Sequence, residues 1–175
     1  MRMTRMDLDA IFISMKTLTS NSLDETQKIA LDWLARIAAK YSDSDEALVV
    51  GLSGHLGAGK TAFVKAVAKE LGIMEIVTSP TFVIMKIYEL RGSTSPRLNL
   101  EEVEPRIWPW HRLVHIDAYR LERPEELAAL NFEVVVSDRN NLVIIEWPEN
   151  VGLKEFQENL HIRFEIKENV YTVSF

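Results

Sequence analysis

The chain has 175 residues, a length typical of one compact domain. Hydrophobic residues make up 47% and charged residues 26%, which excludes collagen-like, disordered and coiled-coil chains. The 26 acidic and 20 basic residues give a net charge of −6, so the chain is a poor general binder of nucleic acid, which needs a basic face. The absence of cysteine excludes disulfides and thiolate zinc sites, and it suits a cytoplasmic location.

The sequence predicts no membrane segment and no leader. No apolar run reaches the length of roughly 18 residues that a spanning helix needs. Residues 1–16 lack the continuous apolar region of a secretory signal, because two aspartates interrupt their apolar patch. We therefore expect a single domain over residues 1–175, with an irregular insertion at 91–112.

The first half of the chain predicts a buried strand with one helix before it and one helix after it. Ser22 and Glu25 form a capping box before apolar residues at helical spacing. A short, β-branched apolar run follows, which is typical of a strand buried on both faces. The expected elements are a helix over 23–40, a strand over 47–52, a glycine-rich turn at 54–59 and a helix over 61–71.

The second half predicts further short strands and one short helix. Pro124 occupies the first turn of that helix. Near the C-terminus, apolar and polar residues alternate, which indicates a half-exposed antiparallel hairpin. The expected strands are 76–77 and 82–88 around a turn at Ser79-Pro80, then 113–116, 142–145, 160–166 and 170–175.

These elements predict an α/β sandwich with a mostly parallel sheet and a C-terminal antiparallel hairpin. Ligands bind such sheets at the carboxyl ends of their strands. Lys60, Asp117 and Glu146 all lie just beyond an expected strand end. We therefore expect one site to collect these three side chains.

Residues 54–61 match the phosphate-loop pattern GxxxxGK[ST] in full, between a strand and a helix. Glycines let backbone N–H groups cradle phosphate oxygens at a positive helix terminus. The motif therefore predicts a P-loop NTPase-like fold that binds ATP, with Lys60 on the β- and γ-phosphates and Thr61 on Mg²⁺. The residues expected to bind ATP are Gly54, His55, Leu56, Gly57, Ala58, Gly59, Lys60 and Thr61.

Glu146 follows four apolar residues and has the form of the second nucleotide motif. Mg²⁺ prefers hard oxygen ligands and keeps several waters, so one carboxylate with Thr61 and phosphate oxygens suffices. The simpler alternative is a core strand followed by a solvated glutamate. Beside a phosphate loop, we favour the metal ligand.

Asp117 also follows a short apolar strand and is predicted to orient the attacking water. Arg120 is a candidate to neutralise charge on the γ-phosphate, and the alternative is a surface ion pair with Glu122 or Glu126. If residues 115–117 are extended, we expect His115 to point away from Asp117. For His115 a packed histidine is the simpler interpretation.

Thr81 lies in a turn a few residues after the helix that follows the phosphate loop. Switch segments of such ATPases occupy this place, so Thr81 is a candidate sensor of the γ-phosphate, with Ser79 a weaker one. An ordinary turn is the alternative.

In this order, the motifs resemble the bacterial tRNA threonylcarbamoyladenosine biosynthesis ATPases of the TsaE (YjeE) family. Ser22–Thr26 resembles the polar element that this family places near the base. The strongest resemblance comes from HxDxYR with PEEL and from IEWP, which are more specific than the phosphate loop. The matching segments are GLSGHLGAGKTAFVKAVAKELGI, VTSPTFVIMKIYEL, HIDAYRLERPEEL and VIIEWPEN, within 51–90 and 115–150.

The resemblance implies a cytoplasmic ATPase with two mutually related partners: the threonylcarbamoyl transferase subunit and its companion subunit. The transferase modifies adenosine beside the tRNA anticodon, so this chain would meet tRNA only indirectly.

The resemblance also implies roles for residues of this chain. It places Lys60, Thr61 and Glu146 on phosphate and Mg²⁺, Asp117 in hydrolysis and Thr81 in a switch. It places Trp147 beside the nucleotide. His55 departs from the family pattern, in which this position is usually acidic.

Two other functional classes compete. A small-molecule or nucleotide kinase shares the phosphate loop, but its lid would be the insertion 91–112, whose acidic residues would repel phosphates. A guanine-nucleotide switch protein needs an NKxD-type base reader, which the sequence lacks. The insertion itself, with Trp108 and Trp110, is either a surface elaboration covering the sheet edge or a contact for a partner or tRNA.

Overall fold

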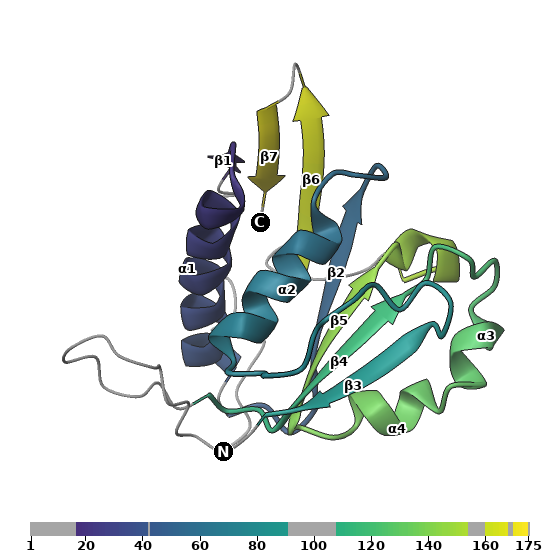
Figure 1. The fold of residues 1–175 in the computed structure, drawn as a ribbon. Coiled ribbons are helices and arrows are strands. Elements are labelled where there is room, and N and C mark those ends of the chain that lie inside the picture. The colour runs from purple at the N-terminus through teal and green to yellow at the C-terminus, as the bar shows by residue number, and fades with distance from the viewer. Residues whose placement is uncertain (1–16, 42, 91–107, 154–159, 168–169, 175) are drawn as a thin grey trace, which may run out of the picture.

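A computed structural model describes residues 17–41, 43–90, 108–153, 160–167 and 170–174 (Figure 1). The expectations for 1–16 and for the insertion at 91–107 concern residues outside these ranges. None of the described helices combines the length and apolar character needed to cross a bilayer. The elements are β1 (Thr17–Ser20), α1 (Leu23–Tyr41), β2 (Leu48–Gly54), α2 (Lys60–Glu70), β3 (Met85–Glu89), β4 (Arg112–Asp117), α3 (Glu125–Ala128), α4 (Phe132–Val136), β5 (Asn141–Glu146), the 3₁₀ turn η1 (Pro148–Val151), β6 (His161–Lys167) and β7 (Val170–Ser174).

The seven described strands form one sheet in the order β1-β7-β6-β2-β5-β4-β3. The four central strands β6, β2, β5 and β4 are mutually parallel, and the antiparallel pairings lie toward both edges. The predicted α/β fold with a mostly parallel sheet and a C-terminal antiparallel hairpin is confirmed. The phosphate-loop strand β2 lies between β6 and β5, so elements distant in the sequence flank the loop.

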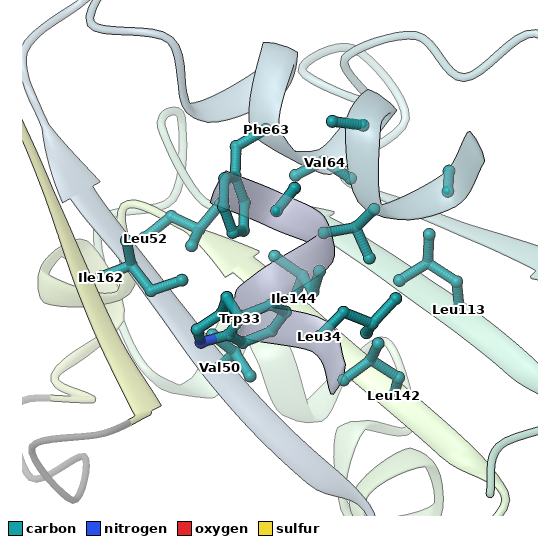
Figure 2. Close-up of a cluster of buried hydrophobic side chains, with 14 of the residues drawn as sticks. Trp33, Leu34, Val50, Leu52, Phe63, Val64, Leu113, Leu142, Ile144 and Ile162 are labelled. Atoms are coloured by element: carbon teal, nitrogen blue, oxygen red, sulfur yellow. The ribbon is translucent and has the colours of Figure 1, made fainter. Parts of the chain in front are cut away.

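Helices α1 and α2 pack on one face of the sheet, and this face carries the larger core. Figure 2 shows Trp33 of α1 and Phe63 of α2 packed among side chains of the central strands, such as Val50 and Leu52. The rings of Trp33 and Phe63 meet edge to face, with centroids 5.4 Å apart. The opposite face packs against side chains of α3, α4 and η1. Because both faces are covered, β4 and β5 are buried almost throughout, as their apolar sequences predict.

The predicted capping box at the start of α1 is confirmed. The Glu25 backbone N–H donates to Ser22 Oγ (3.2 Å), and the Asn21 N–H donates to a Glu25 carboxylate oxygen (2.6 Å). The first bond satisfies a backbone N–H group that the helix leaves unpaired in its first turn, and the second ties Glu25 to Asn21, the residue before the cap.

Several elements differ from the sequence-based expectations. No strand forms at 76–77, and the strand expected from residue 82 begins only at Met85. Residues 81–83 instead form a turn, closed by Ile84 with φ of 65°. Strand β1 and helix α4 were not expected, and β1 is stabilised by pairing with β7 at the other end of the chain.

Candidate functional site

The phosphate loop connects the end of β2 to the start of α2 at the carboxyl edge of the sheet. Its first glycine, Gly54, has φ of 140°, and a Cβ placed there would lie 2.3 Å from the carbonyl oxygen of Phe164 on β6. Only glycine fits this close approach. At the other end, Gly59 caps α2 with φ of 102°, a conformation that favours glycine.

Lys60 is folded back into the loop rather than extended into solvent. Its side chain is buried, and Nζ donates to the carbonyl oxygens of Gly54 (2.6 Å) and His55 (3.0 Å). Nζ also lies 3.9 Å from the centroid of the Trp147 ring. Burial lowers the pKa of Lys60, and the nearby carboxylates, Glu146 first, oppose that shift. The ammonium group is thus desolvated within the loop, and no carboxylate of the described residues bonds it directly.

Thr61 and Glu146 face each other across the start of α2 and the end of β5. The Thr61 hydroxyl lies 2.9 Å and 3.1 Å from the two Glu146 carboxylate oxygens. Glu146 is 3% exposed, so the alternative of a solvated glutamate is wrong. His115 Nε2 lies 2.9 Å from Glu146 Oε1.

His115 is fully buried, as the packed-histidine interpretation predicts. The expectation that it points away from Asp117 is wrong. Residues two apart on a strand share a face, and β4 is extended from Arg112 to Asp117.

Asp117 holds the segment Thr78–Val83, which we call the switch segment. Its Oδ2 accepts hydrogen bonds from the hydroxyls of Thr81 and Ser79, the latter at 2.8 Å. Its Oδ1 accepts the backbone N–H of Tyr119 (3.1 Å). Because Asp117 and Glu146 are register partners in the parallel pair β4–β5, the switch segment and the Thr61–Glu146 pair lie at neighbouring strand ends.

Arg120 lies beside the switch segment, with its guanidinium carbon 4.6 Å from the centroid of the Phe82 ring. The alternative partner Glu126 instead accepts the backbone N–H groups of Glu122 and Arg123. The expected role of Arg120 on a γ-phosphate stays a prediction.

The remaining residues expected at the site differ in how far their side chains are exposed to solvent. His55 and Leu56 are exposed at the tip of the loop, whereas Ala58 is buried. Trp147 packs against Tyr119, with ring centroids 5.3 Å apart, and adopts φ of 60°.

A hollow of about 410 Å³ lies on the β6 side of the loop. Its lining residues are Ser53, Gly54, His55, Arg163, Phe164, Glu165 and Ile166.

The two tryptophans at the end of the expected insertion pack against the protein. Trp110 is buried in the core beneath α1 and α2. Trp108 packs against the same core and donates its ring N–H to the Glu70 carbonyl (3.2 Å). For these two residues the contacts favour the surface elaboration that packs on the protein, and residues 91–107 of the insertion lie outside the described ranges.

Sequence reasoning missed Glu149 and His161. The Ser53 hydroxyl lies 2.8 Å from a Glu149 carboxylate oxygen and 2.7 Å from His161 Nε2. Desolvation lowers the pKa of His161, Arg163 adds to the shift and Glu149 opposes it. Only the pairing of β6 with β2 brings His161 here, and no local pattern in the sequence indicates that pairing.

The donor set fits a magnesium ion that is held jointly with phosphate. Within the described ranges, no group of three or more histidine or acidic side chains could hold a metal ion by itself. Thr61 and Glu146 nevertheless supply two hard oxygen donors next to the helix terminus. Mg²⁺ commonly binds through one or two protein oxygens, with phosphates and water completing its shell.

Comparison with known proteins identifies the family. The family model of the threonylcarbamoyl adenosine biosynthesis protein TsaE matches residues 20–172. A curated "tRNA threonylcarbamoyladenosine biosynthesis protein TsaE" from Streptomyces coelicolor is 34% identical over 118 residues, 67% of this chain and 68% of the relative. The Treponema pallidum protein of the same name is 34% identical over 121 residues, 68% and 75% of the two chains. The Mycobacterium bovis relative is 32% identical over 123 residues, and the match spans 67% of this chain and 63% of that relative.

A solved structure has the same fold. The crystal structure of Bacillus subtilis YdiB matches with a TM-score of 0.56 and 25% identity, over 92% of this chain and 85% of that one. The sheet with its phosphate loop, the matched family model and these relatives all agree. This chain belongs to the family of the threonylcarbamoyl adenosine biosynthesis protein TsaE.

Proposed function

We propose that this protein is a magnesium-dependent ATPase that acts as an accessory switch in the threonylcarbamoyl modification of tRNA adenosine next to the anticodon. The observation that carries the proposal is the phosphate loop in which Lys60 is buried beside the Thr61–Glu146 pair. The pathway follows from family membership and from the names of the curated relatives.

The loop residues bind the triphosphate. Backbone N–H groups at the start of α2 face a phosphate with the positive end of the helix dipole. Lys60 Nζ, which now bonds two loop carbonyls, has its charge within the loop and can turn to the β- and γ-phosphates. Thr61 and Glu146 hold Mg²⁺, which neutralises phosphate charge when it is bound.

Hydrolysis depends on the second carboxylate. Asp117 positions the attacking water, and Thr81, which bonds Asp117 in this structure, reports the state of the γ-phosphate. Arg120 neutralises charge that develops on that phosphate, and Trp147 covers the site beside Lys60.

The partners are the threonylcarbamoyl transferase subunit and its related companion subunit, in the cytoplasm. With a net charge of −6, this chain meets tRNA only through them. The described elements pack as one sheet with its covering helices, which supports a single ATPase domain.

Lys60→Ala tests the proposal. Loss of charge-assisted hydrogen bonds worth about 2–3 kcal/mol should lower ATP affinity by about a hundredfold. Lys65→Ala is the matched control, because Lys65 is an exposed lysine on the same helix. Isothermal titration calorimetry with Mg²⁺·ATP measures both variants. Undiminished affinity in Lys60→Ala would remove the phosphate-loop assignment.

A further inference from the structure

A buried histidine lies directly behind the proposed magnesium ligand. His115 on β4 is 0% exposed and Glu146 on β5 is 3% exposed. Their side chains meet at 2.9 Å, between Nε2 and Oε1. His115 pairs in register with Ile144, two residues before Glu146, so it lies deeper in the sheet than the carboxylate that it contacts.

The chemistry of the pair fixes which atom donates. An ionised carboxylate only accepts hydrogen bonds, so the imidazole hydrogen in this contact belongs on Nε2. Nδ1 is buried and has no partner among the described residues. The Nε2–Glu146 contact is therefore the hydrogen bond that the His115 ring makes among the described residues.

Among the described residues, loss of that bond would leave the Thr61 hydroxyl as the side-chain donor to Glu146. The Thr61 hydroxyl has one hydrogen, although it lies within reach of both carboxylate oxygens. A buried carboxylate that loses a hydrogen-bond donor is costly, and its rotamer is less restricted. His115 is the more restricted donor, because its ring is fully buried in the sheet core.

We infer that His115 is a positioning residue that holds Glu146 for Mg²⁺. It anchors Oε1, so that lone pairs of Oε2 and the oxygen of Thr61 stay free for the metal. Residues that orient a metal ligand in this way stabilise the bound ion without touching it. The inference rests on the proposed function, because it needs Mg²⁺ at Thr61 and Glu146.

Three variants test it by calorimetry with ATP, in Mg²⁺ and in EDTA. His115→Leu fills the space without a donor and should weaken the magnesium-dependent part of ATP binding by about tenfold or more. ATP binding in EDTA should be unchanged. His115→Gln places an amide N–H near the position of Nε2 and should restore most of the loss, whereas the shorter His115→Asn should not.

A role in packing alone predicts the opposite order. Apolar leucine would then preserve magnesium dependence better than polar glutamine, and that order would overturn the inference. Unchanged magnesium dependence in His115→Leu would overturn it as well. If His115→Leu does not fold, the glutamine and asparagine variants test the inference, because magnesium dependence should be stronger in His115→Gln than in His115→Asn.

The wild-type protein gives a second readout. Long-range ¹H–¹⁵N spectra of the His115 ring should show its hydrogen on Nε2, and a hydrogen on Nδ1 would contradict the inference. A failure of the proposed function would look different, because the wild-type protein would then not bind Mg²⁺·ATP. Failure of the inference alone would leave wild-type binding and the Lys60→Ala defect intact.

Discussion

The phosphate loop and the switch segment lie at the same edge of the sheet, but they are attached to it differently. The loop is fixed by packing and hydrogen bonds: Gly54 lies against β6, Lys60 is buried, and Thr61 contacts a buried carboxylate. In the switch segment, Phe82 and Val83 are 85% and 61% exposed. Besides its own turn, that segment is held by hydroxyls that converge on Asp117 and by the contact of Arg120 with the Phe82 ring.

We propose that this difference gives the two regions separate tasks. A loop with a preorganised backbone would bind phosphate with little reordering beyond a turn of the Lys60 side chain, which preserves affinity. A segment held mainly by two hydrogen bonds to a carboxylate, each worth about 2 kcal/mol net, can be released by a ligand that competes for them. Local stability should therefore be high in the loop and low in the switch segment.

The largest loss of stability should come from disrupting the contact between the phosphate loop and β6. Gly54→Ala forces a Cβ to within 2.3 Å of the Phe164 carbonyl at φ of 140° and should cost roughly 3 kcal/mol of unfolding free energy. Gly57→Ala is the matched control, because its Cβ would meet nothing within 4 Å, and its strain at φ of 77° should cost only about 1 kcal/mol. Urea denaturation measures both. Equal losses would mean that the contact with β6 does not lock the loop.

An intermediate effect should come from loosening the switch segment. Thr81→Ala removes a hydroxyl that bonds the Asp117 carboxylate and should cost about 2 kcal/mol locally, seen as faster hydrogen exchange at residues 78–83. It should also reduce the difference in affinity for the labelled partner complex between the ATP and ADP forms, while ATP binding is mostly kept.

Thr81→Ser retains the hydroxyl and is the control for that prediction. It should behave as wild type in both measurements. If partner affinity in wild type is the same with ATP and ADP, the switch role of this segment is wrong.

The smallest effect should be a pH dependence beside the loop. Burial and Arg163 lower the pKa of His161 from its ordinary 6.5, with Glu149 opposing. The unfolded chain therefore binds the proton more readily, so stability is present above pH 6.5 and is lost as the pH falls through the folded-state pKa. As the pH falls below 6.5, the wild-type protein should lose more unfolding free energy than the His161→Gln variant. Chemical denaturation of both proteins at several pH values measures this loss. Parallel pH profiles would contradict the prediction.

Local patterns predicted the parts of the site that are continuous in sequence. The capping box, the apolar runs before Asp117 and Glu146 and the glycine loop each depend on neighbouring residues, so they could be recognised directly. The strand expected at Ile76–Val77 was wrong because two apolar residues form a strand only where a neighbouring strand offers hydrogen bonds.

The sequence by itself determined the α/β class, the phosphate loop and the positions of its candidate ligands, because periodicity and turn chemistry act over a few residues. Only the tertiary structure decided that β6 flanks β2, which brings Phe164 against Gly54 and His161 against Ser53. It also decided that His115 contacts Glu146. Such contacts depend on which strands pair, and pairing between distant segments is set by the energy of the whole core rather than by any local pattern.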